Sequence, residues 1–112
     1  MSRIPDRLLE HTVTLRGRRP IPSSTGQKYL PAVITRSITV AKTKTVIDQR
    51  DETRGQEVVS DTHVLVQPEF WVPPGSLMIV WPGTPQERTL EIVACAIGRH
   101  SIAWESAQFW GV

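Results

Sequence analysis

Hydrophobic and polar residues alternate with a period of two along most of this chain, as they do in β-strands that bury one face. Val13 and Leu15 alternate with threonine and arginine, which predicts a first strand over residues 11–17. Residues 32–47 are rich in Thr, Val and Ile and predict one bent strand, or two short strands with a break near Arg36. The best helix signal is the segment IPDRLLEH near the N-terminus, which has room for about two turns.

A long hairpin is predicted where two strand segments, residues 38–47 and 57–67, flank the sequence DQRDETRG. Its tip consists of Asp48, Gln49, Arg50, Asp51, Glu52, Thr53, Arg54 and Gly55, of which the glycine suits a turn position with positive φ. The strand after the tip places Asp61 and His63 on one face with Val59 and Leu65. A face of this mixed kind is either solvated or meets another subunit. We expect the hairpin to hold its charged tip away from the rest of the fold.

Three further strands follow the hairpin. Residues 76–81 and 88–97 are apolar and are joined by a Gly/Pro turn, which predicts a second hairpin, and the segment SIAWESAQFWGV alternates as a last strand. The Pro- and Gly-rich residues 17–31 predict a long exposed loop, which in a small domain is functional or disordered. The expected fold is therefore mainly β: one domain over residues 1–112, a small antiparallel β-barrel or sandwich with long loops and at most one short helix.

Composition narrows the setting in which such a domain works. A chain of 112 residues can bury a core without a metal or a disulfide. The single cysteine, Cys95, fits a reducing compartment and lies in an apolar strand, which indicates a buried, inert thiol. No apolar stretch has the length of a signal peptide or a membrane span, so we expect no membrane partner.

Charge is distributed unevenly along the chain. Residues 1–44 contain nine Lys/Arg against two Asp/Glu, whereas residues 45–112 contain four against nine. Such polarity favours stacking on oppositely charged neighbours, or places a basic segment near nucleic acid. The alternative is an ordinary solvated surface in which the two halves mix.

Local signatures of catalysis and of cofactor binding are missing from the sequence. The three histidines are scattered, without the spacing of a zinc site. The nearest approaches to a ligand set are Glu10 beside His11 and Asp61 near His63, and isolated histidines on strands are more often surface or interface residues. We therefore predict that the chain is not an enzyme and has no catalytic residues, no cofactor and no metal.

Four tryptophans leave a nucleic-acid-binding β-barrel open as an alternative, because bases stack on exposed aromatic rings. Trp81 and Trp104 lie in apolar strands and are expected in the core, which leaves Trp71 and Trp110 as contact candidates. No single strand alternates aromatic and basic residues, so this alternative is the weaker one.

Taken in order, these features resemble the small head-closure proteins of tailed bacteriophages, also called stoppers or head-to-tail joining proteins. The resemblance is one of order and spacing over most of the chain. Ser76 stands where an Asp is common in the family, and the last strand ends in FWGV instead of a longer tail. The segments that carry the resemblance are RLLEHTVTLRGRR, RGQEVVSDTHVLVQPEF, VPPGSLMIVW and LEIVACAIGRHSIAWESAQFW.

This resemblance implies a structural virion protein of the neck, assembled in the host cytoplasm. Six or twelve identical subunits would form a ring that docks below the portal and adaptor rings and offers its other face to tail terminator or tail tube proteins. Loops that project into the central channel help to retain packaged double-stranded DNA in this family, and the tip at residues 48–55 is the candidate for that loop. The related alternatives are an adaptor or a tail terminator, and adaptors tend to be helical.

Two further segments are candidates for partner contact. The loop at residues 17–31 is a candidate docking loop for the adaptor ring or for DNA phosphates, with Arg18, Arg19 and Lys28 as its basic residues and Arg16 directly before it. The segment SITVAKTKTV is a candidate sheet edge to which a partner could add a strand. Its lysines, Lys42 and Lys44, would otherwise protect that edge from aggregation.

Overall fold

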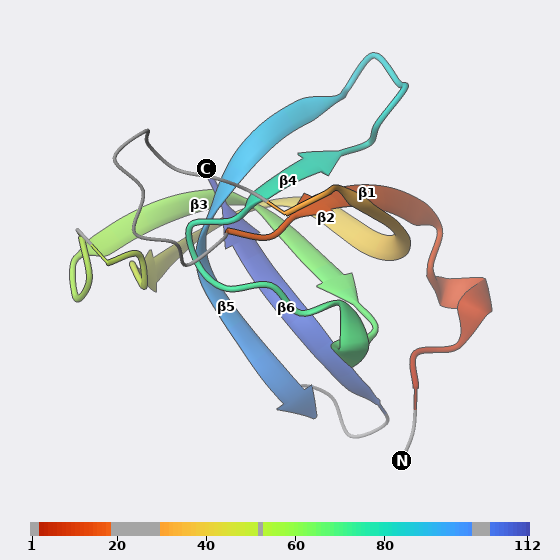
Figure 1. Cartoon of the computed structure of the whole chain (residues 1–112), viewed down its shortest axis with the longest axis horizontal. Coiled ribbons are helices and arrows are strands. Elements are labelled where there is room, and N and C mark those ends of the chain that lie inside the picture. The colour runs from red at the N-terminus through yellow and green to blue at the C-terminus, as the bar shows by residue number, and fades with distance from the viewer. Residues whose placement is uncertain (1–2, 19–29, 52, 100–103) are drawn as a thin grey trace.

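The computed structural model describes residues 3–18, 30–51, 53–99 and 104–112, and their strands form a closed antiparallel barrel (Figure 1). Around the barrel the strand order is β1-β2-β3-β6-β5-β4, which confirms the prediction of a mainly β antiparallel fold. The N-terminal helix signal gives only a single 3-10 turn. The elements are η1 (Asp6–Leu8), β1 (His11–Arg16), β2 (Val33–Ile47), β3 (Glu57–Val66), η2 (Pro68–Phe70), β4 (Leu77–Val80), β5 (Arg88–Arg99) and β6 (Glu105–Gly111).

The core lies inside the barrel and is built from alternate residues of its strands. Val13 and Leu15 of β1 point inward beside Met78 and Val80 of β4, and all four are buried, as the period-two pattern predicts. Phe109 of β6 is the largest side chain among the fully buried ones. The cluster contains Val13, Leu15, Val64, Val66, Met78, Val80, Leu90, Ile92, Ala107 and Phe109, with Phe70, Val72, Trp81 and Cys95 packed against it.

Strand β2 is continuous and has no break at Arg36, whose guanidinium instead donates a hydrogen bond to the Leu9 carbonyl (2.6 Å). The strand changes direction later, at a bulge between Ala41 and Lys44, because a bulge adds residues on one strand only and bends it. The inward side chains before the bulge, Ser37 and Thr39, are small and buried, and their hydroxyls lie 2.8 Å apart.

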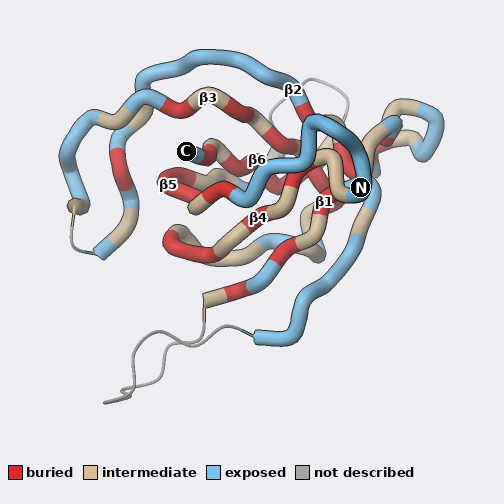
Figure 2. Tube along the Cα trace, turned by 90° about the horizontal axis from the view of Figure 1, so that it is seen from above, coloured by how far each residue is buried: buried red, intermediate tan, exposed pale blue. Residues whose placement is uncertain are grey.

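Strands β2 and β3 extend beyond the barrel wall. β1 pairs with β2 only as far as Ser37, and β6 pairs with β3 only from Thr62 onward. Residues 42–47 and 57–61 therefore continue as a two-stranded ribbon, which we call the arm, and the tip (residues 48–55) closes it. Figure 2 shows β2 exposed along much of its length. The predicted long hairpin is thus confirmed, and Gly55 has the positive φ (90°) expected at its turn.

Candidate functional site at one end of the barrel

The tip folds back onto the barrel, so the expectation that it stands away from the fold is wrong. Asp48 is only 2% exposed, and its carbonyl accepts a hydrogen bond from the Gly55 amide (3.0 Å), which closes the turn. The Gln49 amide donates to the Val93 carbonyl of β5 (2.7 Å), and the Gln49 side-chain oxygen accepts from the Cys95 amide (3.2 Å). These bonds occupy the edge of β5 beyond Glu91, where pairing with β4 ends.

Three charged side chains, which we call the clamp, hold the tip in this position: Asp48, Arg50 and Glu91. The Arg50 guanidinium donates from Nη2 to Asp48 Oδ2 (2.6 Å) and from Nε to Asp48 Oδ1 (3.0 Å). Its Nη1 contacts Glu91 Oε1 on β5, so one guanidinium joins the tip to the barrel wall. Because Arg50 donates to both oxygens of a buried carboxylate, it holds the pKa of Asp48 well below its usual range.

The start of the docking loop lies at the same end of the barrel. The Arg18 amide donates to Ser76 Oγ (2.8 Å), and Arg18 Nη1 lies 3.5 Å from Asp51 Oδ2 of the tip. Gly75 has φ +91°, and a Cβ there would lie 2.9 Å from Arg18 Nη1, so the absent side chain leaves room for the arginine. The structure thus brings Arg18 and the tip together, although they are far apart in sequence.

The other candidate site residues have different positions. Arg16 ends β1 and is exposed on the outer wall of the barrel, and Arg54 is exposed at the tip. Among the described residues neither forms an ion pair. Arg19, Lys28 and Glu52 lie outside the described residues.

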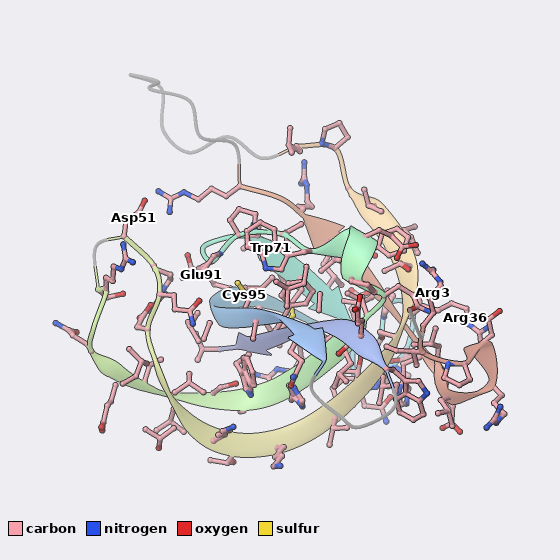
Figure 3. All side chains as sticks on the ribbon, turned by 90° about the horizontal axis from the view of Figure 1, so that it is seen from below. Arg3, Arg36, Asp51, Trp71, Glu91 and Cys95 are labelled. Atoms are coloured by element: carbon pink, nitrogen blue, oxygen red, sulfur yellow. The ribbon has the colours of Figure 1, made fainter. Side chains whose placement is uncertain are left out.

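Apolar side chains are also exposed at this end. Leu30 donates its amide to the Gly17 carbonyl (2.8 Å), and both Leu30 and Val33 are about half exposed. Trp71 is exposed as well and lies beside Cys95 in Figure 3, and the Cys95 thiol lies 3.8 Å from Gln49 Oε1 of the tip. Burial raises the pKa of the Cys95 thiol, which keeps this half-buried group protonated at neutral pH.

The histidines considered as metal ligands are occupied by other contacts. His11 Nδ1 accepts a hydrogen bond from the Thr39 amide (3.2 Å). His63 Nε2 is hydrogen-bonded to Gln108 Oε1, with 2.6 Å between the two atoms. Asp61 pairs with Arg88 at 3.0 Å. Within residues 3–18, 30–51, 53–99 and 104–112, no three His, Cys, Asp or Glu side chains gather as metal ligands would.

Of the two tryptophans predicted as contact candidates, Trp71 and Trp110, only Trp71 is available for contact among the described residues. Trp81 packs against the core as expected. The Trp110 ring is not free for a base, because the His63 ring stacks on it (5.0 Å between centroids) and the Lys44 ammonium lies 5.2 Å from its centroid. Of the two contact candidates, Trp71 is therefore the exposed one.

Sequence reasoning missed the barrel's half of this site, Glu91, Ser76 and the edge of β5. Glu91 is far from the tip in sequence, and no local pattern pairs it with Arg50. One signal was present: Glu91 is a lone carboxylate within the apolar strand LEIVACAI, and a charge in such a setting usually has a partner.

Comparison with protein-family models, curated proteins and solved structures finds no match to this chain. No helix in the described part of the chain is long and apolar enough to cross a membrane.

The clamp predicts a specific pH dependence of stability. The pKa of Asp48 is depressed in the folded state, whereas in the unfolded chain its carboxyl titrates near the ordinary value of about 4. Its stabilising contribution is therefore complete above that value and is lost as the pH falls through the acid range. We expect Asp48→Asn to be less stable than the wild type at pH 7 and to lose less stability between about pH 5 and pH 2, as measured by urea unfolding at a series of pH values.

Asp51→Asn is the matched control, because the Asp51 side chain is 79% exposed and belongs to the same tip. This variant should keep the pH dependence of the wild type. An Asp48→Asn variant that loses stability with acid as steeply as the wild type would contradict the assignment.

Proposed function

We propose that this chain is a structural subunit of the neck of a tailed bacteriophage, a head-closure or stopper protein. In this role identical subunits form a ring below the portal and adaptor, help to retain the packaged DNA and present a surface for tail attachment. The observation that carries the proposal is the meeting of the tip and the docking loop at one end of a closed barrel, through Arg18 and Asp51.

A subunit that obstructs a channel needs a loop in a fixed position relative to a rigid body. The closed barrel is such a body, and the clamp ties the tip to it through Arg50 and Glu91. The exposed part of the tip carries both signs of charge, with Asp51 and Arg54. Mixed charge allows tips of neighbouring subunits to pair by contacts between arginine and carboxylate, so that the tips block the passage without binding DNA tightly.

The same subunit needs surfaces for the rings above and below it. Beyond Ser37 the outer edge of β2 has no strand partner among the described residues, which suits strand addition by an adaptor or tail protein. Lys42 and Lys44 on this segment discourage unspecific pairing of the edge.

Electron microscopy of lysates from the encoding phage with this gene disabled tests the proposal. We expect free tails beside tailless heads that have lost their DNA, because unclosed heads cannot retain it. A plasmid copy of the wild-type gene should restore tailed particles. Normal, infectious particles from the phage with the disabled gene and no plasmid copy would contradict the proposal and favour a nucleic-acid-binding barrel. Salt-sensitive DNA binding by the isolated chain is the direct measurement of that alternative.

Complementation with a tip variant tests the tip separately. The double variant Asp51→Ser, Arg54→Ser leaves the clamp in place and removes one exposed charge of each sign from the tip. We expect the variant protein to be incorporated into the heads, and these heads to retain DNA less well than heads with the wild-type protein. The fraction of filled heads measures the difference. The control is Asp6→Ser, Arg7→Ser, which removes the same two charges from the η1 turn and should complement fully.

A further inference from the structure

The outward face of the arm has exposed apolar side chains that no described residue covers. Ile47 lies opposite Glu57, and Thr45 lies opposite Val59, so all four side chains share one face of the ribbon. Ile47 is 53% exposed and Val59 is 56% exposed. Glu57 forms no ion pair among the described residues. We call Ile47, Glu57 and Val59 the arm patch.

A second patch of the same kind lies on the outer wall of the barrel. Thr14 of β1 pairs with Ile34 of β2 on one side and with Ile79 of β4 on the other, and all three point away from the core. Ile34 is 71% exposed, the highest value among the large apolar residues described. Arg16, two residues after Thr14 on the same face, is exposed and unpaired among the described residues. We call Ile34, Ile79 and Arg16 the wall patch.

The two patches are complementary, but they lie too far apart to contact each other within one copy of the chain. Each combines branched apolar side chains with one charge that has no ion-pair partner in the described part of the chain, negative on the arm (Glu57) and positive on the wall (Arg16). Ile34 lies near the start of β2 and Ile47 at its end, roughly 40 Å apart along the strand by the rise of an extended chain. Exposed apolar groups rimmed by charge are typical of interaction sites.

We propose that the arm patch of one copy packs against the wall patch of a second copy. Ile47 and Val59 then cover Ile34 and Ile79, and Glu57 meets Arg16. The inference rests on the proposed ring and names the contact that builds it. Each copy uses its arm toward one neighbour and its wall toward the other, which is a heterologous contact, and such contacts close into rings when the rotation allows.

Pairing of two arms edge to edge is the competing arrangement, and the sequence of β2 opposes it. Antiparallel pairing of two β2 edges centred on Thr43 would place Lys42 of one copy opposite Lys44 of the other. Like charges directly opposite each other destabilise an antiparallel pair. Such pairing would also be symmetric and would end at a dimer.

Sedimentation velocity of the purified chain tests this contact with one variant for each patch. Ile47→Glu breaks the arm patch and Ile34→Glu breaks the wall patch, and both positions are exposed, so the barrel core is untouched. We expect the wild type to form species larger than a dimer and each variant alone to remain monomeric. Mixed, the two variants retain one intact contact between them, namely the arm of the Ile34→Glu chain and the wall of the Ile47→Glu chain. The mixture should therefore form dimers and nothing larger.

Gln86→Glu is the control, because it adds the same charge on the exposed turn between β4 and β5 and should assemble as the wild type does. A charge exchange gives a second readout: Glu57→Arg and Arg16→Glu should each weaken assembly, and the two changes together should restore it. Assembly of both glutamate variants at the wild-type level, or a mixture that stays monomeric, would overturn the inference.

These outcomes separate the contact from the function. Glutamate variants that still assemble would leave the proposed ring standing on other surfaces, and only this contact would be lost. A wild-type chain that stays monomeric at the highest attainable concentration would overturn the contact itself. The lysate experiment judges the neck function independently of either result.

Discussion

Replacing Arg50 with methionine is expected to lower the free energy of unfolding by about 2–3 kcal/mol, because it leaves a buried carboxylate without its charged partner. Asp48 is buried beneath the guanidinium and would keep neutral donors such as the Arg50 amide (2.9 Å) but not its charged partner. Methionine keeps much of the length and the apolar contacts of the arginine stem, so the loss of stability is due to the missing charge. Urea unfolding at pH 7 measures it.

The same substitution should also release the tip from β5. The Gln49 amide, which donates to the Val93 carbonyl, is expected to exchange its hydrogen faster in the variant than in the wild type. Arg54→Met is the matched control, since Arg54 belongs to the same tip but is exposed and forms no ion pair among the described residues. Equal stability of the Arg50 and Arg54 variants would show that the clamp contributes nothing.

Replacing Phe109 with alanine is expected to be more damaging, with a loss of about 3–5 kcal/mol. Phe109 is fully buried on β6, opposite Val64 of β3 and Cys95 of β5. Its removal leaves a cavity where these three strands meet, and a closed barrel cannot collapse to fill it without breaking strand pairing. A loss of this size is a large part of the free energy of unfolding of an ordinary domain. We therefore expect part of the variant population to be unfolded at about 37 °C.

Ile97→Ala is the control for this prediction, because Ile97 is on the neighbouring β5 but is 57% exposed. Its truncation should change stability by less than about 0.5 kcal/mol. Thermal unfolding followed by circular dichroism distinguishes the two. If both variants were equally stable, the assignment of Phe109 to the centre of the core would be wrong.

The strands and their inward faces could be predicted from the sequence, because burial on one side of a strand leaves a local signal at every second residue. Val13, Leu15 and Phe109 illustrate this signal. The order of the strands around the barrel could not be predicted. The pairs β1 with β4 and β3 with β6 join segments far apart in the chain, and the sequence has no local pattern that selects these partners.

The candidate site was predicted only in part. The sequence identified the tip and Arg18 by their charge and their turn residues, which are local properties. It did not indicate that they meet, because the bulge between Ala41 and Lys44 that redirects the arm contains no glycine or other turn signal. Glu91 was missed for the same reason, since its role depends on where the arm arrives.

The position of β6 between β3 and β5 has a consequence for how the chain folds. The hairpins β2–β3 and β4–β5 pair segments adjacent in sequence and can form early, as can the local turn at the tip. The barrel cannot close until β6 has entered the gap between them, so residues 105–111 must leave the ribosome before the core is sealed. During synthesis the partly built barrel exposes the edges of β3 and β5, and these edges are open to pairing with other chains until β6 has joined them.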